Sequence, residues 1–208
     1  MFRIDMHIHT VLGGDALIRP EEVVPRAREA GLDAVCVTEH HSFDLSAPFE
    51  AIAEETGFPV LRGFEYSAME GHLLIYGVRA GKGDILPGLP IQDVIDWVNR
   101  RGGVAVPAHP FQKGMVGKAL GSRLLTLRNL VAVETLNGSL SPQDNEKARA
   151  AAEEMGLWGV GGSDAHGTHV LGRVCTLFPC RIRTTAELVA ALKAGGYRPV
   201  DNLDQKAD

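Results

Sequence analysis

The sequence predicts an α/β fold, and three observations lead to this expectation. Apolar, β-branched runs alternate with amphipathic stretches almost to the end of the chain, which is typical of a wound α/β architecture. The chain has 208 residues, which is enough for one sizeable core, and α/β barrels of this size are normally single domains. Its content of 45% hydrophobic and 23% charged residues is ordinary for a globular protein. We therefore expect a single domain over residues 1–208, with a disordered tail at about 202–208.

Short apolar runs bounded by turn-forming residues mark the expected strands. The first run begins at the second residue, and amphipathic or glycine-rich stretches separate most of the later ones. The expected strands cover residues 2–9, 34–38, 60–64, 72–76, 104–108, 132–136, 158–160 and 174–178.

Two of the intervening stretches carry clear helix end signals. In residues 19–31, Pro20 stands at an expected first helical position and Gly31 at the end, although Pro25 should bend the helix. In residues 184–196, a hydroxyl side chain and Glu187 form a capping pattern, and two glycines close the helix. The glycine-rich residues 81–90 and 111–123 are expected to be loops.

Charge and hydropathy argue against several classes of function. The formal net charge of -5, the 6% aromatic content and the lack of a long basic cluster argue against a stable nucleic-acid complex. No apolar run approaches the roughly 20 residues that span a bilayer. Arg3, Asp5 and His7 interrupt the first apolar segment, so we expect no secretion signal and a cytoplasmic protein.

The three cysteines do not predict a structural cross-link. Cys36 and Cys175 lie in apolar runs, where a small buried thiol is the expected role, and Cys180 makes the number odd. Neither a disulfide framework nor a zinc ribbon is indicated.

The segment DMHIHT places two histidines one residue apart near the start of the chain. Successive side chains of a strand alternate between its faces, so Asp5, His7 and His9 should share one face. Two histidines on one face are half of a metal-binding arrangement, although an isolated H-x-H is more often a feature of a surface strand. The remaining ligands must come from elsewhere in the chain.

Further histidines and carboxylates follow the expected strands. In parallel α/β barrels the carboxyl ends of the strands converge on one mouth, so side chains at these ends should meet. One histidine after one strand can be explained as a structural residue whose hydrogen bonds are satisfied. Ionisable residues at five successive strand ends instead indicate a shared site. These ends carry Glu39, His40, His41, Glu65, His109, Glu134, Asp164 and His166.

Imidazole and carboxylate ligands together suit zinc, iron or manganese, and this many ligands could hold more than one ion. Two divalent ions about 3.5 to 4 Å apart can polarise a phosphoryl oxygen, acidify a shared water and stabilise the leaving oxygen. The pattern therefore favours ester hydrolysis with a bridging hydroxide as the nucleophile.

Nine short motifs occur in the order found in one known family. They are DMHIHT, GDALIRPEE, VTEHH, GFEYSA, GHLLIYG, AHPF, VETLN, GSDAH and ALKAGGYRPV. On these motifs the chain resembles the PHP family, the polymerase and histidinol phosphatase domain, along nearly its whole length. The resemblance implies a distorted (β/α)7 TIM-like barrel, a metal-dependent phosphoesterase activity and up to three divalent ions.

The resemblance also implies a set of metal ligands. His7, His9 and Asp164 would bind the first ion, and Glu65 would bridge the first ion and the second. A metal-bound hydroxide held by Glu65 and Asp164 would be the nucleophile. The second ion would also take His72 and His109, and the third would take Asp15, His40 and His166. Asp15 departs from the family pattern, because Gly13-Gly14-Asp15 stands where a Ser-Asp-Gly type of turn is common.

Three cations lie in or beside the loops that carry ligands. Lys113, His169 and Arg173 could contact a substrate phosphate. Most loop cations are merely solvated, so a solvent-exposed role is the alternative for each of them.

Four residues are expected to support the ligands rather than bind metal. Glu134 should hydrogen-bond a ligand histidine, and Asp5 should support the first histidine pair from behind. Glu39 and His41 flank His40 where the family commonly reads Thr-Asp-His-Asp, and they are expected beside the ligands or in the pocket wall.

We therefore expect a phosphoesterase that hydrolyses a phosphate mono- or diester of a small molecule, nucleotide or oligonucleotide. It would use two or three Zn, Mn or Fe ions and act on a small anionic phosphorylated substrate, with no membrane partner. The sequence leaves the substrate, the metal and the oligomeric state open. One alternative is a non-catalytic, metal-stabilised partner module. Another is an amidohydrolase-type hydrolase, whose barrels also begin with H-x-H but often bridge their metals with a modified lysine.

Overall fold

The computed structural model describes residues 1–112 and 119–202 of the chain, and these ranges contain nine β-strands and five α-helices. The strands are β1 (Phe2–Ile8), β2 (Ala34–Val37), β3 (Val60–Ser67), β4 (His72–Tyr76), β5 (Val104–Ala108), β6 (Ala132–Asn137), β7 (Trp158–Gly162), β8 (Val174–Phe178) and β9 (Arg198–Asp201). The helices are α1 (Pro20–Glu29), α2 (Phe49–Thr56), α3 (Ile91–Arg100), α4 (Pro142–Met155) and α5 (Thr185–Ala194), and two 3-10 turns are η1 (Phe43–Ser46) and η2 (Gly121–Thr126).

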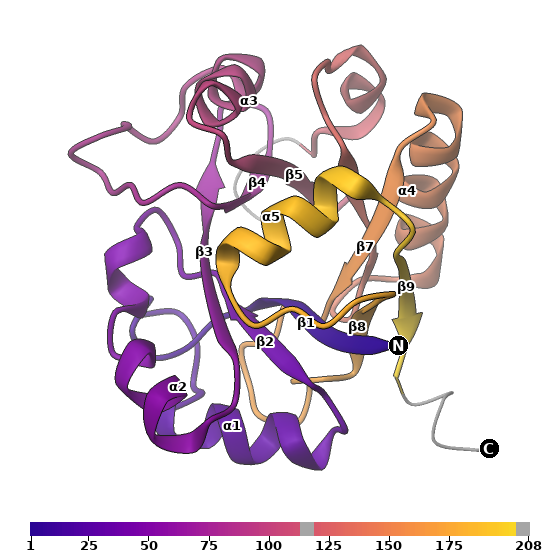
Figure 1. The fold of residues 1–208 in the computed structure, drawn as a ribbon. Helices are drawn as coiled ribbons and strands as arrows, with labels where there is room; N and C mark the ends of the chain where they lie inside the picture. The colour runs from indigo at the N-terminus through magenta and orange to yellow at the C-terminus, as the bar shows by residue number, and fades with distance from the viewer. Residues whose placement is uncertain (113–118, 203–208) are drawn as a thin grey trace.

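Strands β1 to β7 follow one another around a distorted barrel (Figure 1). Within the described residues, β5, β4, β3, β2, β1, β8 and β9 form one hydrogen-bonded sheet in that order, and β6 pairs with β7. The β6–β7 pair packs beside β5 on one side and beside β1 on the other, so it closes the curled sheet. The chain is therefore a mixed α/β protein with a TIM-like barrel arrangement, as the sequence predicts.

Strand direction differs from the expected parallel barrel at β4 and β8. β1, β2 and β3 pair in parallel, whereas β4 is antiparallel to both β3 and β5, and β8 is antiparallel to β1. The link between β3 and β4 is residues 68–71, and a parallel crossover needs about a dozen residues or more. The expectation of parallel strands is wrong at β4 for this reason. The start of β4 therefore lies beside the carboxyl ends of β3 and β5.

The barrel interior is a buried apolar cluster closed at one end by α5. Side chains from β1 to β7, including Met6, Cys36 and Leu74, pack together with Leu188 and Leu192 of α5. Helix α5 contacts β3, β4 and β5 and crosses the strands in Figure 1. This packing leaves the opposite end of the barrel, where β1, β3 and β5 finish, to the polar side chains.

The expected strands at 72–76, 104–108 and 174–178 agree with the structure to the residue. Helix α5 begins with the expected capping box, in which the Thr184 hydroxyl accepts from the Glu187 amide and the Glu187 carboxylate accepts from the Thr184 amide. Strand β9 was not expected, because it has four residues and contains Pro199. Proline is tolerated there because β9 is the last strand of its sheet.

Asn202, the last described residue, is anchored to the rest of the fold. The Asn202 side chain is buried and donates to the carbonyl oxygens of Ala30 and Gly172, so a frayed tail does not begin at this residue. Residues 203–208 lie outside the described part of the chain, and the assignment of the whole chain to one domain stays a prediction. No helix in residues 1–112 and 119–202 is long and apolar enough to cross a membrane.

Candidate metal centre

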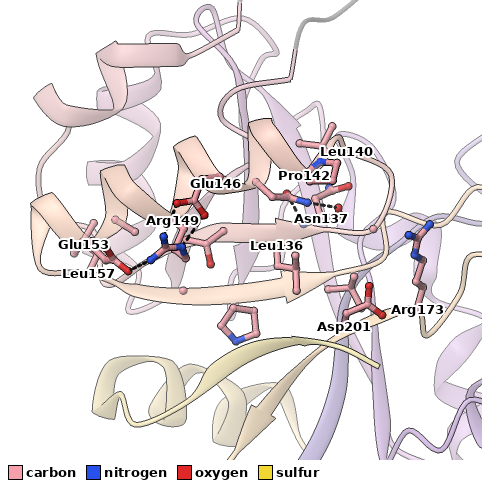
Figure 2. Close-up of a pocket in the computed structure, with 17 residues that line it drawn as sticks. Leu136, Asn137, Leu140, Pro142, Glu146, Arg149, Glu153, Leu157, Arg173 and Asp201 are labelled. Carbon is pink, nitrogen blue, oxygen red and sulfur yellow. Dashed lines mark hydrogen bonds and ion pairs between the residues drawn. The ribbon is translucent and has the colours of Figure 1, made fainter. Parts of the chain in front are cut away.

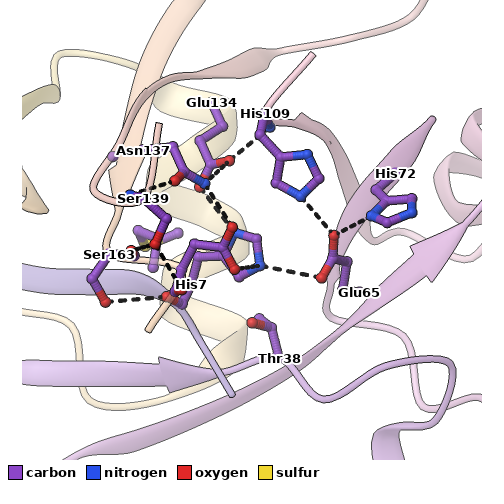
Figure 3. Close-up of polar contacts among 12 residues, drawn as sticks. His7, Thr38, Glu65, His72, His109, Glu134, Asn137, Ser139 and Ser163 are labelled. Atoms are coloured by element: carbon purple, nitrogen blue, oxygen red, sulfur yellow. Dashed lines mark hydrogen bonds and ion pairs between the residues drawn. The ribbon is translucent and has the colours of Figure 1, made fainter. Parts of the chain in front are cut away.

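Four predicted ligands, in or just after three strands, converge at the open end of the barrel. Figure 3 shows two of them, His7 and Glu65, facing each other. His7 Nε2 lies 3.0 Å from His9 Nε2 and 3.3 Å from Glu65 Oε2. Glu65 Oε2 lies 3.2 Å from His9 Nε2, and Asp164 Oδ1 lies 3.4 Å from both imidazole nitrogens. All four side chains are buried. We call these residues the first ligand group.

The spacing of the first ligand group fits a bound metal ion. A tetrahedral site with bonds of about 2.0 to 2.2 Å places its ligand atoms roughly 3.3 to 3.6 Å apart, and the distances in this group run from 3.0 to 3.4 Å. His7 Nδ1 donates to Glu134 Oε1 over 3.0 Å, which leaves the lone pair on His7 Nε2. This nitrogen and two carboxylate oxygens thus face one another as acceptors, an arrangement that a cation between them would satisfy.

Glu65 also belongs to a second ligand group with His72 and His109. Its Oε1 atom lies 2.6 Å from His72 Nδ1 and 2.9 Å from His109 Nε2. Its other oxygen faces the first ligand group. The carboxylate thus presents one oxygen to each group, as a bridging ligand must. His72 can take part because it begins the antiparallel strand β4, whose start lies at this end of the barrel.

A third ligand group lies beside His9. Asp15 Oδ2 is 3.0 Å from His40 Nε2 and 3.4 Å from His166 Nε2. The His9 ring is stacked on both His40 and His166, with ring centroids 4.6 Å and 4.5 Å apart. Each of these four residues can offer one ligand atom within 4.8 Å of the others. The unusual turn before Asp15 therefore still brings this carboxylate to its predicted partners.

Two buried nitrogen atoms near the ligand groups support a role in binding a cation. Nδ1 of His9 and Nδ1 of His40 have no hydrogen-bond partner within residues 1–112 and 119–202, and His40 Nδ1 lies 3.4 Å from Glu65 Oε2. Buried polar atoms are normally paired, because leaving one unpaired costs about 1 to 3 kcal/mol. A metal ligand role would satisfy such a nitrogen.

Three of the predicted site residues have left-handed backbone conformations. The φ angle is +63° at His41, +27° at His109 and +51° at Asp164. Such conformations are costly for residues other than glycine and gather at functional sites. Hydrogen bonds hold all three. The His109 amide donates to Glu134 Oε2 over 2.7 Å, and the Asp164 and His41 amides donate to the carbonyls of His7 and Glu65, each over 2.8 Å.

The electrostatics of the first ligand group favour bound positive charge. Burial by itself would lower the pKa of His9, but the Asp164 and Glu65 carboxylates reverse this and raise it to about 9. Burial would likewise raise the pKa of Glu65, but the imidazoles of His7, His109 and His72 hold it well below its usual range. The carboxylates therefore stay ionised, and the group attracts cations.

Glu134 and Asn137 hold the ligands from behind. The Glu134 carboxylate accepts from His7 Nδ1 and from the His109 amide, so one side chain orients a ligand of each of the first two groups. Asn137 Nδ2 donates to Glu134 Oε2 over 3.1 Å and to Asp164 Oδ2 over 3.2 Å. The role of Asn137 was missed in the sequence, where its signal was its place at the end of the VETLN motif.

Asp5 supports the backbone rather than the imidazoles. Its carboxylate accepts from the amides of Ser163, Gly172 and His7 over 2.8, 2.9 and 3.3 Å. The expected alternation does not hold along the strand, because the register of β1 on β2 shifts between Asp5 and Ile8. Met6 therefore packs in the barrel interior, whereas Ile8 packs with residues of α1.

Glu39 and His41 lie on either side of His40, and their hydrogen bonds join the loop after β1 and strand β3. The buried Glu39 carboxylate accepts from the hydroxyl and the amide of Thr10, and burial raises its pKa. The His41 amide donates to the Glu65 carbonyl over 2.8 Å, and the His41 ring lies 5.8 Å from that of His40. Both residues thus fix the backbone beside the ligand groups.

Three cationic side chains were expected to contact the substrate. In the described part of the chain, no contact joins any of them to the ligand groups. Lys113 lies outside the described residues. His169 is exposed and lines hollows beside Arg26 of α1. Arg173 lines a cavity of about 600 Å³ between α4 and strands β6 and β7, outside the barrel (Figure 2). The substrate roles of these residues stay predictions.

The outer cavity contains no ligand group of the described residues. Its charged lining includes Arg149, which is paired with Glu146 and Glu153 on the same helix. Asn137 also lines the cavity, and its side-chain amide donates to the carboxylates of Glu134 and Asp164. The chemistry of the site therefore belongs to the end of the barrel rather than to this cavity.

Comparison with family models gives two matches. The model of the PHP domain matches residues 5–161. A second model, described as PHP-associated, matches residues 142–197. The first match contains every member of the three ligand groups except Asp164 and His166, and these two residues fall in the second match.

Individual relatives agree with these matches. The uncharacterized protein MJ1587 of Methanocaldococcus jannaschii is 28% identical over 145 residues, which are 65% of this chain and 81% of that protein. A two-domain protein from Bacteroides vulgatus, described as containing a predicted PHP-like metal-dependent phosphoesterase, matches 96% of this chain at 19% identity and a TM-score of 0.75. This chain spans 64% of that protein's length.

A second solved structure covers nearly the same length as this chain. It is an amidohydrolase from Chromobacterium violaceum with bound sulfate and no metal, and it matches 98% of this chain and 99% of its own length at 20% identity and a TM-score of 0.66. At these identities the solved structures show that the barrel fold is shared.

Proposed function

Because this chain belongs to the PHP domain family, a family of PHP-like metal-dependent phosphoesterases, we propose that it hydrolyses a phosphate mono- or diester. The substrate class is a small phosphorylated molecule, nucleotide or oligonucleotide. The observation that carries the proposal is the pair of ligand groups that share Glu65, with one carboxylate oxygen directed at each.

The ligand groups assign a place to each ion. His7, His9, Asp164 and Glu65 would hold the first, Glu65, His72 and His109 the second, and Asp15, His40 and His166 the third. When bound, two or three Zn, Mn or Fe ions supply Lewis acidity that polarises a phosphoryl oxygen and acidifies water. Three divalent ions would also more than offset the formal net charge of -5 and allow an anionic ester to approach.

The protein's own residues keep this centre in a single arrangement. Glu134 fixes the tautomer of His7 and the backbone at His109, and Asn137 restrains Glu134 and Asp164 together. Pre-organised ligands of this kind need little rearrangement when charge develops on the substrate. Glu65 Oε2 and Asp164 Oδ1 both lie within 3.4 Å of His7 Nε2 and His9 Nε2, so these two ionised carboxylates would accept a hydrogen bond from the attacking water and orient it.

The Chromobacterium violaceum structure holds a bound sulfate, an anion that shares the tetrahedral shape and negative charge of phosphate. The same protein is described as an amidohydrolase, which makes amide hydrolysis the second candidate. Amidohydrolase-type barrels often bridge their metals with a modified lysine. In this chain Glu65 is the residue shared by the first two ligand groups, which favours the phosphoesterase.

The proposal is tested with purified protein loaded in turn with Zn, Mn and Fe. Metal content is measured on the same preparation that is assayed against phosphate monoesters, phosphodiesters, nucleotides, short oligonucleotides and simple amides. We expect turnover of phosphate esters, and we expect His7→Ala to lower both metal content and turnover. Stoichiometric metal with no phosphate-ester turnover would overturn the proposal and favour a metal-stabilised partner module, and turnover of amides alone would favour the amidohydrolase.

A further inference from the structure

The third ligand group is the most exposed of the three groups. The side chains of Asp15, His40 and His166 are 39%, 25% and 43% exposed. No side chain of the first ligand group is more than 8% exposed. Close packing therefore holds the ligands of the first group, whereas Asp15 depends on the backbone of its own loop to stay opposite the two imidazoles.

Asp15 lies in the loop between β1 and α1, and the arm of this loop that follows Asp15 is tied to another ligand. The Leu17 amide donates to the His166 carbonyl over 2.8 Å. The Val11 amide donates to the Ile18 carbonyl over 2.9 Å, which joins the two arms of the loop. The second arm is therefore fixed relative to one histidine of the group.

The buried carboxylate of Glu39 holds the arm that precedes the ligand aspartate. Glu39 Oε1 accepts from the Thr10 hydroxyl, and Glu39 Oε2 accepts from the Thr10 amide over 3.3 Å. The same hydroxyl accepts from the Leu12 amide over 3.3 Å, and the Thr10 carbonyl accepts from the Gly13 amide over 3.1 Å. Thr10 therefore links Glu39 to the turn that leads to the ligand carboxylate.

Gly13 lies against both Glu39 and Asp15. A Cβ atom on Gly13 would lie 2.4 Å from Glu39 Oε2 and 3.2 Å from Asp15 Oδ1. Gly13 does not have a positive φ, so these carboxylates, rather than backbone strain, exclude a side chain at this position. The absence of a side chain lets the loop pack directly on Glu39, two residues before Asp15.

Glu39 is also fixed relative to His40, which follows it in the chain. The Glu65 amide donates to the Glu39 carbonyl over 3.0 Å, and the His41 amide donates to the Glu65 carbonyl over 2.8 Å. The backbone of Glu39 is thus paired with β3 while its side chain binds the loop after β1. One residue therefore joins the loop of Asp15 to the segment that supplies His40.

We propose that Glu39 is a positioning residue for the third ligand group. It holds Asp15 opposite His40 and His166 and thereby sets the affinity of this group for its ion. Glu39 acts through the loop, since both of its oxygens accept hydrogen bonds from Thr10. The inference rests on the proposed metal-dependent function and identifies the residue that controls the occupancy of one of its ions.

The test measures the number and affinity of ions bound to the full chain. Equilibrium dialysis against a series of free Mn²⁺ concentrations, followed by elemental analysis, gives both quantities for each variant. We expect three bound ions in the unsubstituted protein, and we expect Asp15→Ala to weaken the binding of one of them. This ion is the reference for the variants of the Glu39 contact.

Three variants disturb the Glu39 contact in different ways. Glu39→Gln leaves one acceptor oxygen for the two Thr10 donors, Thr10→Val removes the hydroxyl at nearly constant volume, and Gly13→Ala displaces the Glu39 carboxylate. We expect each to weaken one ion by about 10- to 100-fold and to leave the other two unchanged. Thr10→Val tests the contact from its other side, so the test does not depend on the folding of Glu39→Gln.

Two matched controls and a double variant separate positioning from a general structural role. Thr10→Ser keeps the hydroxyl, and Gly83→Ala adds a methyl group that would meet no atom within 4 Å, so we expect both to retain three ions. Because Glu39 acts through Asp15, adding Glu39→Gln to Asp15→Ala should cause little further loss of affinity. A merely structural role would lower the thermal midpoint of the metal-free protein and weaken all ions alike.

The outcomes distinguish this inference from the function on which it rests. An unsubstituted protein that binds two ions and hydrolyses phosphate esters would refute the positioning role and leave the phosphoesterase standing. Unchanged binding of three ions in all variants of the contact, or equal weakening of all three ions, would also refute it. Selective weakening of one ion in a protein that hydrolyses no phosphate ester would support the role of Glu39 and overturn the phosphoesterase.

Discussion

Glu134 is the residue on which the orientation of His7 depends. Replacing it with glutamine exchanges one acceptor oxygen for an amide that cannot accept from His7 Nδ1. We expect Glu134→Gln to lower metal affinity by about 10- to 100-fold, measured by competition with a chelator of known affinity. The matched control is Glu153→Gln on α4, which removes the same charge from an exposed side chain. Equal affinity in the two variants would contradict the role of Glu134.

The three cysteines allow an independent test of which side chains are buried and which are exposed. Cys180 is exposed, whereas Cys36 and Cys175 are buried. Burial raises the pKa of the Cys175 thiol to about 12 and raises that of Cys36 as well. We expect a disulfide reagent at neutral pH to modify one thiol rapidly and three after denaturation, and Cys180→Ser to remove the rapid phase. Two rapid thiols in the folded protein would show that the packing around Cys36 or Cys175 is wrong.

At the scale of single residues, the sequence predicted the histidine and carboxylate ligands better than the uncharged residues that hydrogen-bond to them. Histidines and carboxylates that follow apolar runs can be recognised in a sequence as candidate ligands, because burying such groups is costly unless they are paired or bind a metal. Asn137 carries no charge, and its two hydrogen bonds depend on how β6 and the end of β7 approach each other. The backbone role of Asp5 was likewise hidden, because it follows from a register shift in β1.

At the scale of elements, the close contact of β7 with β1 gives a sharp prediction. A Cβ atom on Gly162 would lie 2.4 Å from His7 Cβ and 2.7 Å from the His7 nitrogen. We expect Gly162→Ala to push β7 away from His7, to lower metal affinity and to lower the free energy of unfolding by roughly 1 to 3 kcal/mol. Urea unfolding and metal titration of the same preparation measure the two effects.

The control for this substitution is Gly83→Ala. Gly83 has no positive φ, and a Cβ atom there would meet no other atom within 4 Å. We expect this variant to behave as the unsubstituted protein in both measurements. A Gly162→Ala variant that is as stable and binds metal as well as Gly83→Ala would mean that β7 can move away from β1 at little cost.

The positions of the strands could be read from the sequence, but their directions could not. Apolar runs bounded by turns locate a strand, whereas side-chain periodicity is the same for parallel and antiparallel pairing. The four-residue link at 68–71 was the available signal, because such a link permits only a hairpin. The sequence of β9 has no strand pattern that predicts it, because this strand forms through its pairing with β8 at the edge of the sheet.

At the scale of the whole molecule, the ligand groups join parts of the chain that are distant in sequence. The first group links β1, β3 and the segment after β7, and the second links β3, β4 and the end of β5. An ion bound in the first group therefore connects strands from different parts of the barrel, and an ion in the second connects three neighbouring strands. The sequence predicted this convergence through the barrel fold, because the strand ends of a barrel meet at one mouth.

Metal binding should consequently stabilise the entire fold. An ion that binds the native state and not the unfolded chain adds about 2.7 kcal/mol at a free concentration one hundred times its Kd. For a protein of this size each kcal/mol raises the thermal midpoint by about 2 to 4 °C, so one filled site should raise it by about 5 to 11 °C. Differential scanning calorimetry with a chelator and with increasing free metal measures this rise. In His7→Ala we expect the rise to shrink, because the first ligand group is incomplete while Glu65, His72 and His109 remain. A thermal midpoint that is the same with chelator and with excess metal would show that these groups do not bind metal in the folded protein.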